Sequence, residues 1–425
     1  MHWIDQGNRA IVRALAGNRE FMSQATETLS AGAAPHMRLV GVVSTAHCVS
    51  HYYIIILAPL LPFVRAEYGV SYTEIGLAFA AFNVVSAVLQ TPAGFLVDWL
   101  GARILLIAGL IVGAIAFILV GLIDSFWVMV AMFALAGVGN TVYHPADYAL
   151  LSQHVPSKRI GQAFSIHTFA GMLGSAIAPA SLLLMQNVWG WRGAFIGAGI
   201  FGLAVAAILL AMRDNGPALN ETPARKADDT SPVGWKLLLS APILLNLIFF
   251  MLMALMSGGM FNYSVVALGA LYGTPVTLAN GALSSLLFLS AGGVLIGGLI
   301  VTRTPRHSLV ACLGLTGMAV TAALVGSFDF NAFMLVAVMT AFGLFYGIIM
   351  PSRDMIVRDI TPPGSFGKVF GFVTTGFNIG GIISPMIFGA LMDHGSPQLV
   401  FLTVAAFGLI SVLTVATLPK TPIKA

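Results

Sequence analysis

The stretch GVGNTVYHPADY, residues 137–148, has a counterpart 206 positions later in GLFYGIIMPSRD, residues 343–354. The correspondence runs without a gap from 131–179 to 337–385, with ten identities in 49 positions, six of them glycine or proline. Because glycine and proline set backbone geometry, their repetition at a fixed offset indicates a structural repeat. A second correspondence, at an offset of 204, pairs Tyr68-Gly69 with Tyr272-Gly273. The sequence therefore predicts two copies of one structural plan.

Hydrophobic residues make up 58% of the 425 residues and charged residues only 8%, with a mean hydropathy of +0.92. Ordinary soluble domains are far less apolar. Runs of about 20 apolar residues recur along the chain, and each can cross a hydrocarbon core about 30 Å thick. The sequence predicts an all-α polytopic membrane protein with twelve transmembrane helices, at residues 39–64, 72–97, 104–123, 126–151, 160–187, 191–212, 240–267, 275–301, 308–326, 331–357, 367–391 and 397–418.

The basic residues predict the orientation of these spans. If the N-terminus is cytoplasmic, only Arg65 and Arg192 of the 20 Lys and Arg residues fall on the outer side. Cytoplasmic loops of membrane proteins are enriched in Lys and Arg, so we expect an N-in/C-in arrangement in a bacterial cytoplasmic (inner) membrane. The net charge of +4 follows from this asymmetry and gives no reason to expect nucleic-acid binding.

Polar segments divide the chain. Residues 213–234, RDNGPALNETPARKADDTSPVG, read as a flexible cytoplasmic linker between two six-helix halves. We therefore expect an N-terminal bundle at 39–212, a linker at 213–239, a C-terminal bundle at 240–418 and a short tail at 419–425. Residues 1–38 form either an amphipathic helix on the inner leaflet or a disordered tail, and no signal peptide is expected there.

The loop after the second span, GFLVDWLGAR (94–103), resembles a motif of the major facilitator superfamily, carried here by Gly94, Asp98 and Gly101. Ala102 stands where a basic residue is usual, and Arg103 follows it. The resemblance covers residues 39–418. It implies two pseudo-symmetric six-helix bundles, alternating access, a monomer, and a gating role for these four residues (Gly94, Asp98, Gly101 and Arg103). An ordinary surface turn is the alternative.

The segment GVGNTVYHP (137–145) also resembles fosmidomycin-resistance-type exporters of that superfamily, through Gly137, Gly139, Tyr143, His144 and Pro145. The residues after Pro145 follow that group poorly, so the resemblance suggests kinship without fixing a substrate. Span five, GMLGSAIAP (171–179), lacks the glycine–proline pattern typical of drug antiporters. Export of drug-like compounds therefore remains an alternative function.

Charges within the spans are the candidate functional groups. The repeat places Asp147 of span four opposite Arg353 of span ten, at positions that line the central cavity in the family the chain resembles. The two charges could pair across the interface, bind substrate, or lie near the inner surface as gate charges. We favour a cavity role, with Arg353 holding an anionic group because guanidinium offers a fixed fork of donors. Asp354 could form a helix ion pair with Arg358 or join the proton pathway.

Histidines accompany these charges. His144, Asp147 and Tyr148 are spaced i, i+3 and i+4 and share a helix face, while span one carries His47 and His51 with Tyr52, and span five carries His167. Histidine is the side chain that most readily changes charge near neutral pH, so proton coupling is natural for this set. We assign substrate binding and proton coupling as follows: substrate, Arg353, His144, Tyr148, His51, Tyr52 and Asn262; protons, Asp147, His144, His47, His167 and Asp354.

A metal-transport alternative rests on methionines and histidines. Met253, Met256 and Met260 form a stripe on span seven, and His47-x3-His51 can chelate an ion on a helix face. Core packing is the simpler interpretation of the stripe. The Met256-x3-Met260 spacing resembles superfamily copper importers, but span eight lacks their His-x3-Met.

Motifs of other functional classes are missing from the sequence. It contains no Walker A loop, HExxH or GxSxG motif, so we expect neither an ATP-driven pump nor an enzyme, and no cofactor or resident metal. The leading hypothesis is proton-coupled transport of a small organic anion across the lipid bilayer. The non-transport alternative is a membrane scaffold or sensor.

Overall fold

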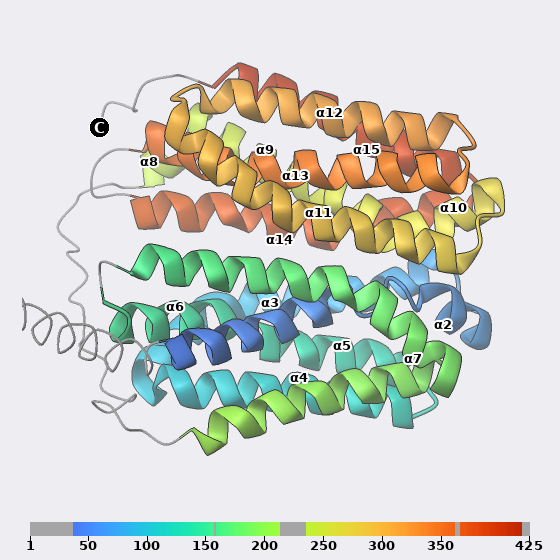
Figure 1. Cartoon of the computed structure of the whole chain (residues 1–425), viewed down its shortest axis with the longest axis horizontal. Helices are drawn as coiled ribbons and strands as arrows, with labels where there is room; N and C mark the ends of the chain where they lie inside the picture. The colour runs from blue at the N-terminus through green and yellow to red at the C-terminus, as the bar shows by residue number, and fades with distance from the viewer. Residues whose placement is uncertain (1–36, 157–158, 213–234, 362–365, 419–425) are drawn as a thin grey trace, which may run out of the picture.

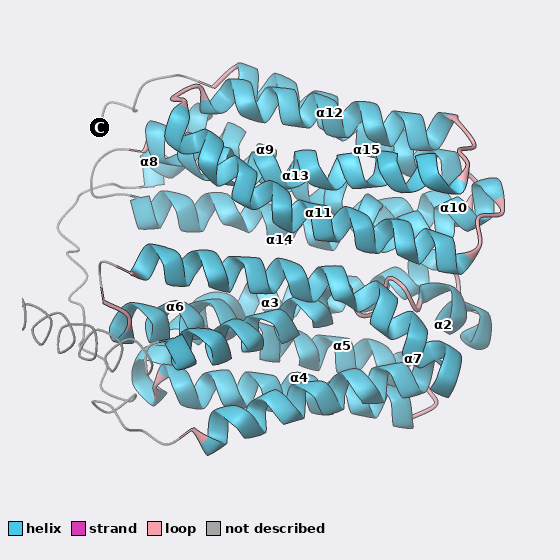
Figure 2. Ribbon diagram, in the orientation of Figure 1, coloured by secondary structure: helices cyan, strands magenta, loops and turns pink. Residues whose placement is uncertain are grey.

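The computed structural model describes residues 37–156, 159–212, 235–361 and 366–418. Within these ranges the ordered elements are all helical (Figure 2). After a first helix at residues 37–55 they are α2 Leu61–Tyr68, α3 Tyr72–Leu100, α4 Ala102–Leu122, α5 Phe126–Asn140, α6 Tyr143–His154, α7 Ile160–Ala211, α8 Trp235–Leu238, α9 Ala241–Gly258, the π-helix η1 Gly259–Tyr263, α10 Ser264–Tyr272, α11 Val276–Arg303, α12 His307–Ser327, α13 Ala332–Ile360, α14 Phe366–Asp393 and α15 Pro397–Ala416.

The helices form two bundles that lie side by side (Figure 1). We call residues 37–212 the N half and residues 235–418 the C half. The halves meet where α3 packs against α14 and α7 packs against α11. The predicted tail at 1–36, the linker at 213–234 and the end at 419–425 lie outside the described residues.

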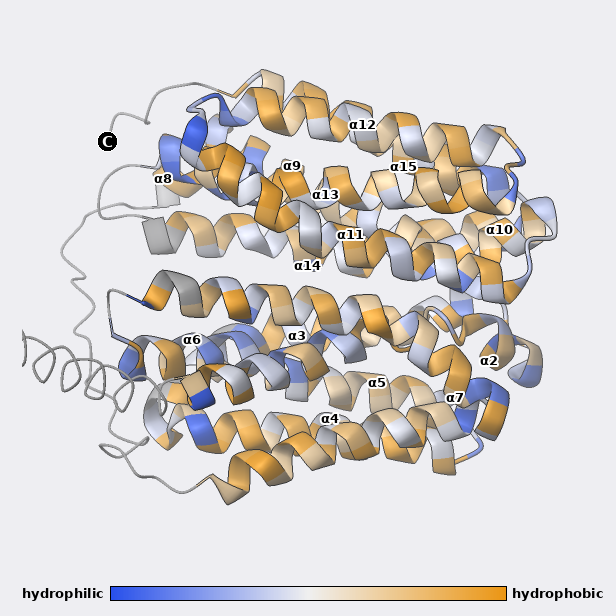
Figure 3. Ribbon diagram, in the orientation of Figure 1, coloured by the Kyte–Doolittle hydropathy of each residue, from blue (hydrophilic) through white to orange (hydrophobic). Residues whose placement is uncertain are grey.

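Ten helical segments of the described chain are long and apolar enough to cross a membrane. Two arrangements account for the difference from the twelve predicted spans. Spans five and six are the two arms of α7, which reverses direction at Gly190, whose φ of 72° is not helical. Span one is a helix at 37–55 that passes through turns at 56–60 into α2. Figure 3 shows apolar residues along the helix shafts and polar residues toward the ends.

The repeat glycines mark where helices approach most closely. A Cβ at Gly137 would lie 2.6 Å from the carbonyl oxygen of Phe82 on α3, and one at Gly343 would overlap the carbonyl of Leu286 on α11. These equivalent contacts hold α5 to α3 and α13 to α11. Because backbone atoms cannot move aside as a side chain can, only glycine fits at both positions.

The second set of repeated residues also has a common conformation. Gly69 and Gly273 follow equivalent helices, α2 and α10, and both adopt left-handed conformations, with φ of 63° and 65°. A residue with a side chain is strained in this region. The pairing of Tyr68-Gly69 with Tyr272-Gly273 in the sequence therefore reflects a shared helix ending.

The repeated prolines behave differently in the two halves. Span four is broken at Thr141–Val142, and α6 begins at Tyr143, two residues before Pro145. Pro351, in contrast, lies within the continuous helix α13. The helical pattern is therefore interrupted just before Pro145, and α6, which carries His144 and Asp147, begins at this interruption.

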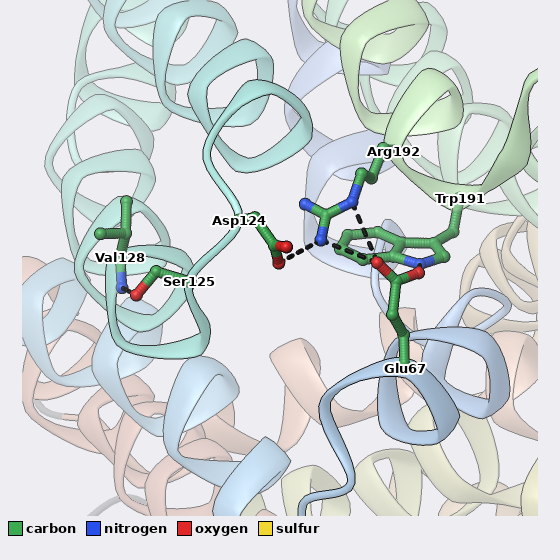
Figure 4. Close-up of polar contacts among 6 residues, drawn as sticks. All are labelled: Glu67, Asp124, Ser125, Val128, Trp191 and Arg192. Carbon is green, nitrogen blue, oxygen red and sulfur yellow. Dashed lines mark hydrogen bonds and ion pairs between the residues drawn. The ribbon is translucent and has the colours of Figure 1, made fainter.

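A polar clamp closes the N half at the end away from residues 37 and 212 (Figure 4). The guanidinium of Arg192 on α7 lies 2.8 Å from Glu67 on α2 and 2.5 Å from Asp124 in the α4–α5 loop. Trp191 donates its indole N–H to the second oxygen of Glu67 at 2.5 Å. The turn at Gly190 places Trp191 and Arg192 for these contacts, so the clamp joins three parts of the N half.

Candidate functional site

A buried carboxylate lies at the centre of the N half. The side chain of Asp147 on α6 is 0% exposed. Its Oδ2 atom lies 3.4 Å from Nδ1 of His47 on the first helix and 3.7 Å from Nε2 of His167 on α7. Three separate helices therefore bring one carboxylate and two imidazoles together.

The other two intramembrane histidines join this group. The ring of His47 lies 4.6 Å from that of His51, 5.2 Å from that of His144 and 3.9 Å from that of His167, measured between centroids. Gly171 of α7 allows this packing, since a Cβ there would overlap the His47 ring. We call His47, His51, His144, His167 and Asp147 the histidine cluster. The structure gathers all four histidines that the sequence analysis singled out.

Several polar atoms of the histidine cluster lack a hydrogen-bond partner among the described residues. Among the described residues, Oδ1 of Asp147 and both ring nitrogens of His167 are buried without a hydrogen-bond partner. A lone buried carboxylate charge is costly, and the cost falls when a proton neutralises it or a neighbouring imidazole becomes imidazolium. The arrangement can therefore hold an exchangeable proton. His51 has a hydrogen-bond partner outside the cluster, because its Nδ1 lies 3.3 Å from the hydroxyl of Ser175.

A fixed cation lies in the C half. Arg353 on α13 is 8% exposed, and its guanidinium carbon lies 4.6 Å and 5.0 Å from the ring centres of Phe250 and Phe377. Its Nε and Nη2 atoms lie 2.8 Å and 2.7 Å from Oδ1 of Asp354. The two rings fix the guanidinium plane by cation–π attraction. One edge of the fork is therefore presented to a carboxylate group, which in this state is Asp354.

Tyr148 links the two halves of the site. It is 45% exposed, and its ring lies 5.8 Å from His167 and 6.2 Å from His144. Its hydroxyl also lies within electrostatic reach of Asp354 and Arg353. The side chain of Asp354 is itself 44% exposed. Tyr148 and Asp354 therefore bring partly exposed polar groups of the two halves near one another.

The structure separates some predicted partners. Asp147 has its close contacts with His47 and His167, and Arg353 has its own with Asp354 and Met350, so the two charges do not pair directly here. The repeat gives them equivalent places, but the contacts of Asp147 lie within its own bundle. Asp354 pairs with its neighbour Arg353, where a helix pair with Arg358 was the simpler expectation.

Two predicted substrate ligands lie away from the histidine cluster. Tyr52 is 3% exposed, bonds to Ser181 through its hydroxyl at 2.8 Å and packs its ring on Phe201. Asn262 belongs to η1 of the C half and is half-buried. π-Helical turns occur often at functional sites, so its assignment stays a prediction.

The predicted gating loop is described in part. Gly101 ends α3 with a φ of 91°, which explains the need for glycine, and no heavy atom lies within 4 Å of a Cβ placed at Gly94. Arg103 donates to the carbonyl oxygens of Leu209 and Met212, at the end of α7. This contact complements the negative end of the helix dipole. The side chain of Asp98 lies outside the described residues, and the gating role stays a prediction.

The imidazoles of His47, His144 and His167 carry ligand nitrogens within 4.8 Å of one another, which is the nearest approach to a metal-binding group in the described residues. The methionines of span seven do not join them, since Met253, Met256 and Met260 are 0% exposed and belong to the hydrophobic core. This placement supports the core-packing interpretation of the methionine stripe.

Sequence reasoning missed the groups that orient Arg353. Phe250 and Phe377 are two of 28 phenylalanines in an apolar chain, so nothing in their local sequence distinguishes them. It also missed Tyr346, which is buried beside Phe261 of η1 and within electrostatic reach of Arg353. A polar aromatic residue seven positions before an intramembrane arginine, two helical turns away on the same face, was the available signal.

Two packed helical bundles with ionisable groups on both sides of their interface define a membrane carrier of small molecules. Comparison with known sequences gives its family. The sequence pattern of the Major Facilitator Superfamily matches residues 43–309 and 251–425, and the chain belongs to that superfamily. It is therefore a multi-pass membrane protein and a secondary transporter, and not an enzyme.

Several relatives match most of the chain. The fosmidomycin resistance protein of Escherichia coli (strain K12) is 24% identical over 385 residues, 89% of this chain and 92% of that protein. The probable sulfoacetate transporter of Cupriavidus necator is 25% identical over 399 residues, covering 86% and 90%. The hexuronate transporter of Bacillus subtilis (strain 168) is 23% identical over 362 residues, covering 78% and 82%.

Solved structures match the fold. A variant of the nucleoside transporter NupG superposes with a TM-score of 0.75 at 14% identity, covering 90% of this chain and 99% of that one. At this identity the likeness concerns the fold alone. It confirms the all-helical architecture expected from the sequence.

Proposed function

We propose that the protein carries a small organic anion, coupled to protons, by alternating access in a bacterial cytoplasmic membrane with both termini inside. The observation that carries this proposal is the Arg353 fork of the C half, held between two phenylalanine rings and paired, among the described residues, with the half-exposed Asp354. A substrate carboxylate or sulfonate takes the place of Asp354 on the fork. Bidentate pairing of this kind is both strong and selective for planar or trigonal anionic groups.

Proton coupling has two components in this scheme. Protonation of Asp354 weakens its hold on Arg353 and frees the fork for substrate. In the N half, Asp147 and the four imidazoles accept a proton, and Tyr148 lies between these groups and the Arg353–Asp354 pair. Binding a proton and an anion together also reduces the net charge that must cross the membrane, which lowers the electrostatic cost of the step.

The relatives support an anionic substrate. They include transporters named for sulfoacetate, hexuronate and D-galactonate, all organic acids. The histidine cluster and Tyr148 add hydrogen-bonding groups that suit a hydroxylated acid. The proposed substrate class is therefore a small hydroxylated or sulfonated monoanion.

A counterflow assay tests the substrate class. Proteoliposomes are loaded with unlabelled D-galactonate, D-glucuronate or sulfoacetate, and entry of the labelled compound is followed, with D-glucose as the uncharged comparison. We expect exchange of at least one acid, its loss in Arg353→Gln, and its retention in Arg358→Gln, which alters an exposed arginine on the same helix. Preference for the neutral sugar, or normal exchange by Arg353→Gln, would contradict the proposal.

Export of drug-like compounds is the second candidate, favoured by the full-length likeness to the fosmidomycin resistance protein. Deletion of the gene would then lower resistance to a compound, and expression of the wild type would restore it. Restoration by Arg353→Gln would show that export does not use the anion fork.

A further inference from the structure

One carboxylate of the C half caps a helix of the N half. Asp393 is the last residue of α14, and its Oδ1 and Oδ2 atoms accept hydrogen bonds from the backbone N–H groups of Tyr72 and Thr73, at 2.7 Å and 2.8 Å. Tyr72 and Thr73 are the first two residues of α3. The contact lies at the end of the bundle away from residues 37, 212, 235 and 418 (Figure 1), which is the predicted outer side.

The α3 N-terminus divides its donors between the two halves. Its first N–H groups have no partner within the helix. Ser71 and Glu74 form a capping box, in which each side chain accepts from the backbone N–H of the other. The box leaves the N–H groups of Tyr72 and Thr73, and Asp393 takes both. A carboxylate at this position also complements the positive end of the helix dipole.

The backbones of α3 and α14 touch along the same seam. A Cβ at Gly76 would lie 3.0 Å from the carbonyl oxygen of Pro385, and one at Gly389 would lie 2.9 Å from the backbone of Thr73. The hydroxyl of Tyr263 also lies at this contact and donates to the Pro385 carbonyl. The halves cannot part at this end without breaking both hydrogen bonds to Asp393.

The equivalent contact between the halves, where α7 packs against α11, has no such capping carboxylate in the described residues. The repeat relates α3 to α11, whose N-cap residue is Pro275 in place of Ser71 and makes no side-chain capping bond. The position equivalent to Asp393, at the offset of 206, is Asn187, which carries no charge. The capping carboxylate is therefore a feature of the α3–α14 seam.

We propose that Asp393 and the N-terminus of α3 form a latch that holds the outer end of the carrier closed. While the latch is made, access to the central site is from the opposite end. Its release must accompany outward opening, when the N–H groups of Tyr72 and Thr73 pass to water. Charged groups beside this contact in the described residues include Arg65, whose guanidinium lies 4.2 Å from the Tyr72 ring, and Glu74 of the capping box.

A distance measurement between the halves tests the latch without any substrate. In full-length protein with Cys48 and Cys312 replaced by serine, spin labels are placed at Ala66→Cys on α2 and Asp329→Cys in the α12–α13 loop. Both positions are exposed at this end of the bundle. Double electron–electron resonance in nanodiscs then gives the ratio of closed to open populations.

The latch predicts a shift in both acceptor and donor variants. Losing a capping group changes an equilibrium by roughly twofold to thirtyfold, so Asp393→Ala should raise the ratio of open to closed populations by that factor, and Asp393→Asn by less. Tyr72→Pro removes one donor at a position where proline suits a helix, and should shift the distribution the same way. Tyr72→Ala, which keeps the N–H, should shift it less than Tyr72→Pro.

His394→Ala is the matched control, because His394 is exposed and bonds only to Ala390 of its own helix in the described contacts. It should leave the distribution unchanged. Folded Asp393→Asn and Tyr72→Pro proteins with the wild-type distribution would overturn the latch. So would an equal shift in Tyr72→Pro and Tyr72→Ala, since the side chain and not the N–H would then be responsible.

Discussion

Replacing Arg353 by lysine separates charge from geometry at the proposed anion site. Lysine keeps one positive charge, but it offers a compact ammonium in place of a planar fork. In the structure Nε and Nη2 of Arg353 both reach Oδ1 of Asp354, at 2.8 Å and 2.7 Å, and two phenylalanine rings flank the plane. An anion that replaces Asp354 would meet the same pair of donors, of which lysine can supply one in that orientation.

The expected loss follows from one charge-assisted hydrogen bond. Such a bond contributes about 1.5–3 kcal/mol, which corresponds to roughly 10-fold to 100-fold in affinity. We therefore expect Arg353→Lys to raise the half-saturation concentration for the anion by that factor, measured as initial counterflow rate against substrate concentration. Arg358→Lys, on the exposed face of the same helix, should change it by less than twofold. An Arg353→Lys protein with wild-type half-saturation would refute the fork as the reason for arginine.

Three further predictions concern other parts of the molecule. Asp147→Asn should retain counterflow but lose accumulation driven by a pH gradient, which for one proton per anion is about tenfold per pH unit in the wild type; accumulation that persists would remove Asp147 from the coupling. Gly297→Ala should destabilise the protein by about 1–3 kcal/mol, because its Cβ would lie 2.5 Å from the Ile348 carbonyl, whereas Gly298→Ala has open space and should not lower the melting temperature. Trp191→Phe should cost about 1 kcal/mol through the lost bond to Glu67, and Asp124→Asn less than about 0.5 kcal/mol because that side chain is 80% exposed; equal melting temperatures for these two variants would argue against the clamp.

Much of the fold could be predicted because the membrane restricts the solutions. Apolar runs of fixed length predict spanning helices, and repeated glycines identify where the helices touch. Gly137 and Gly343 are examples, since each excludes a Cβ for the same reason in each half. The break before Pro145 could also be anticipated, but Pro351 shows that the same residue at the repeated position can remain within a helix.

The site could be predicted less completely, because helix faces are set by tertiary packing. Intramembrane histidines are rare and functional by default, so their grouping was foreseeable. The contact partners of Asp147 and Arg353 could not be foreseen from the sequence. Repeat symmetry placed Asp147 opposite Arg353, yet the close contacts of Asp147 are with His47 and His167 of its own half. Asp393 gave no signal at all, since a polar residue at a helix end is ordinary until the opposite half is seen to lie against it.

The most direct test of the central claim follows protons and anion together. Proteoliposomes that hold a pH-sensitive dye are challenged with the acid identified by counterflow, and labelled uptake is recorded in parallel. The account predicts that the lumen of wild-type vesicles acidifies as the anion enters and that both signals are lost in Arg353→Gln. Anion uptake without acidification would contradict proton coupling, and acidification that survives in Arg353→Gln would contradict the anion site.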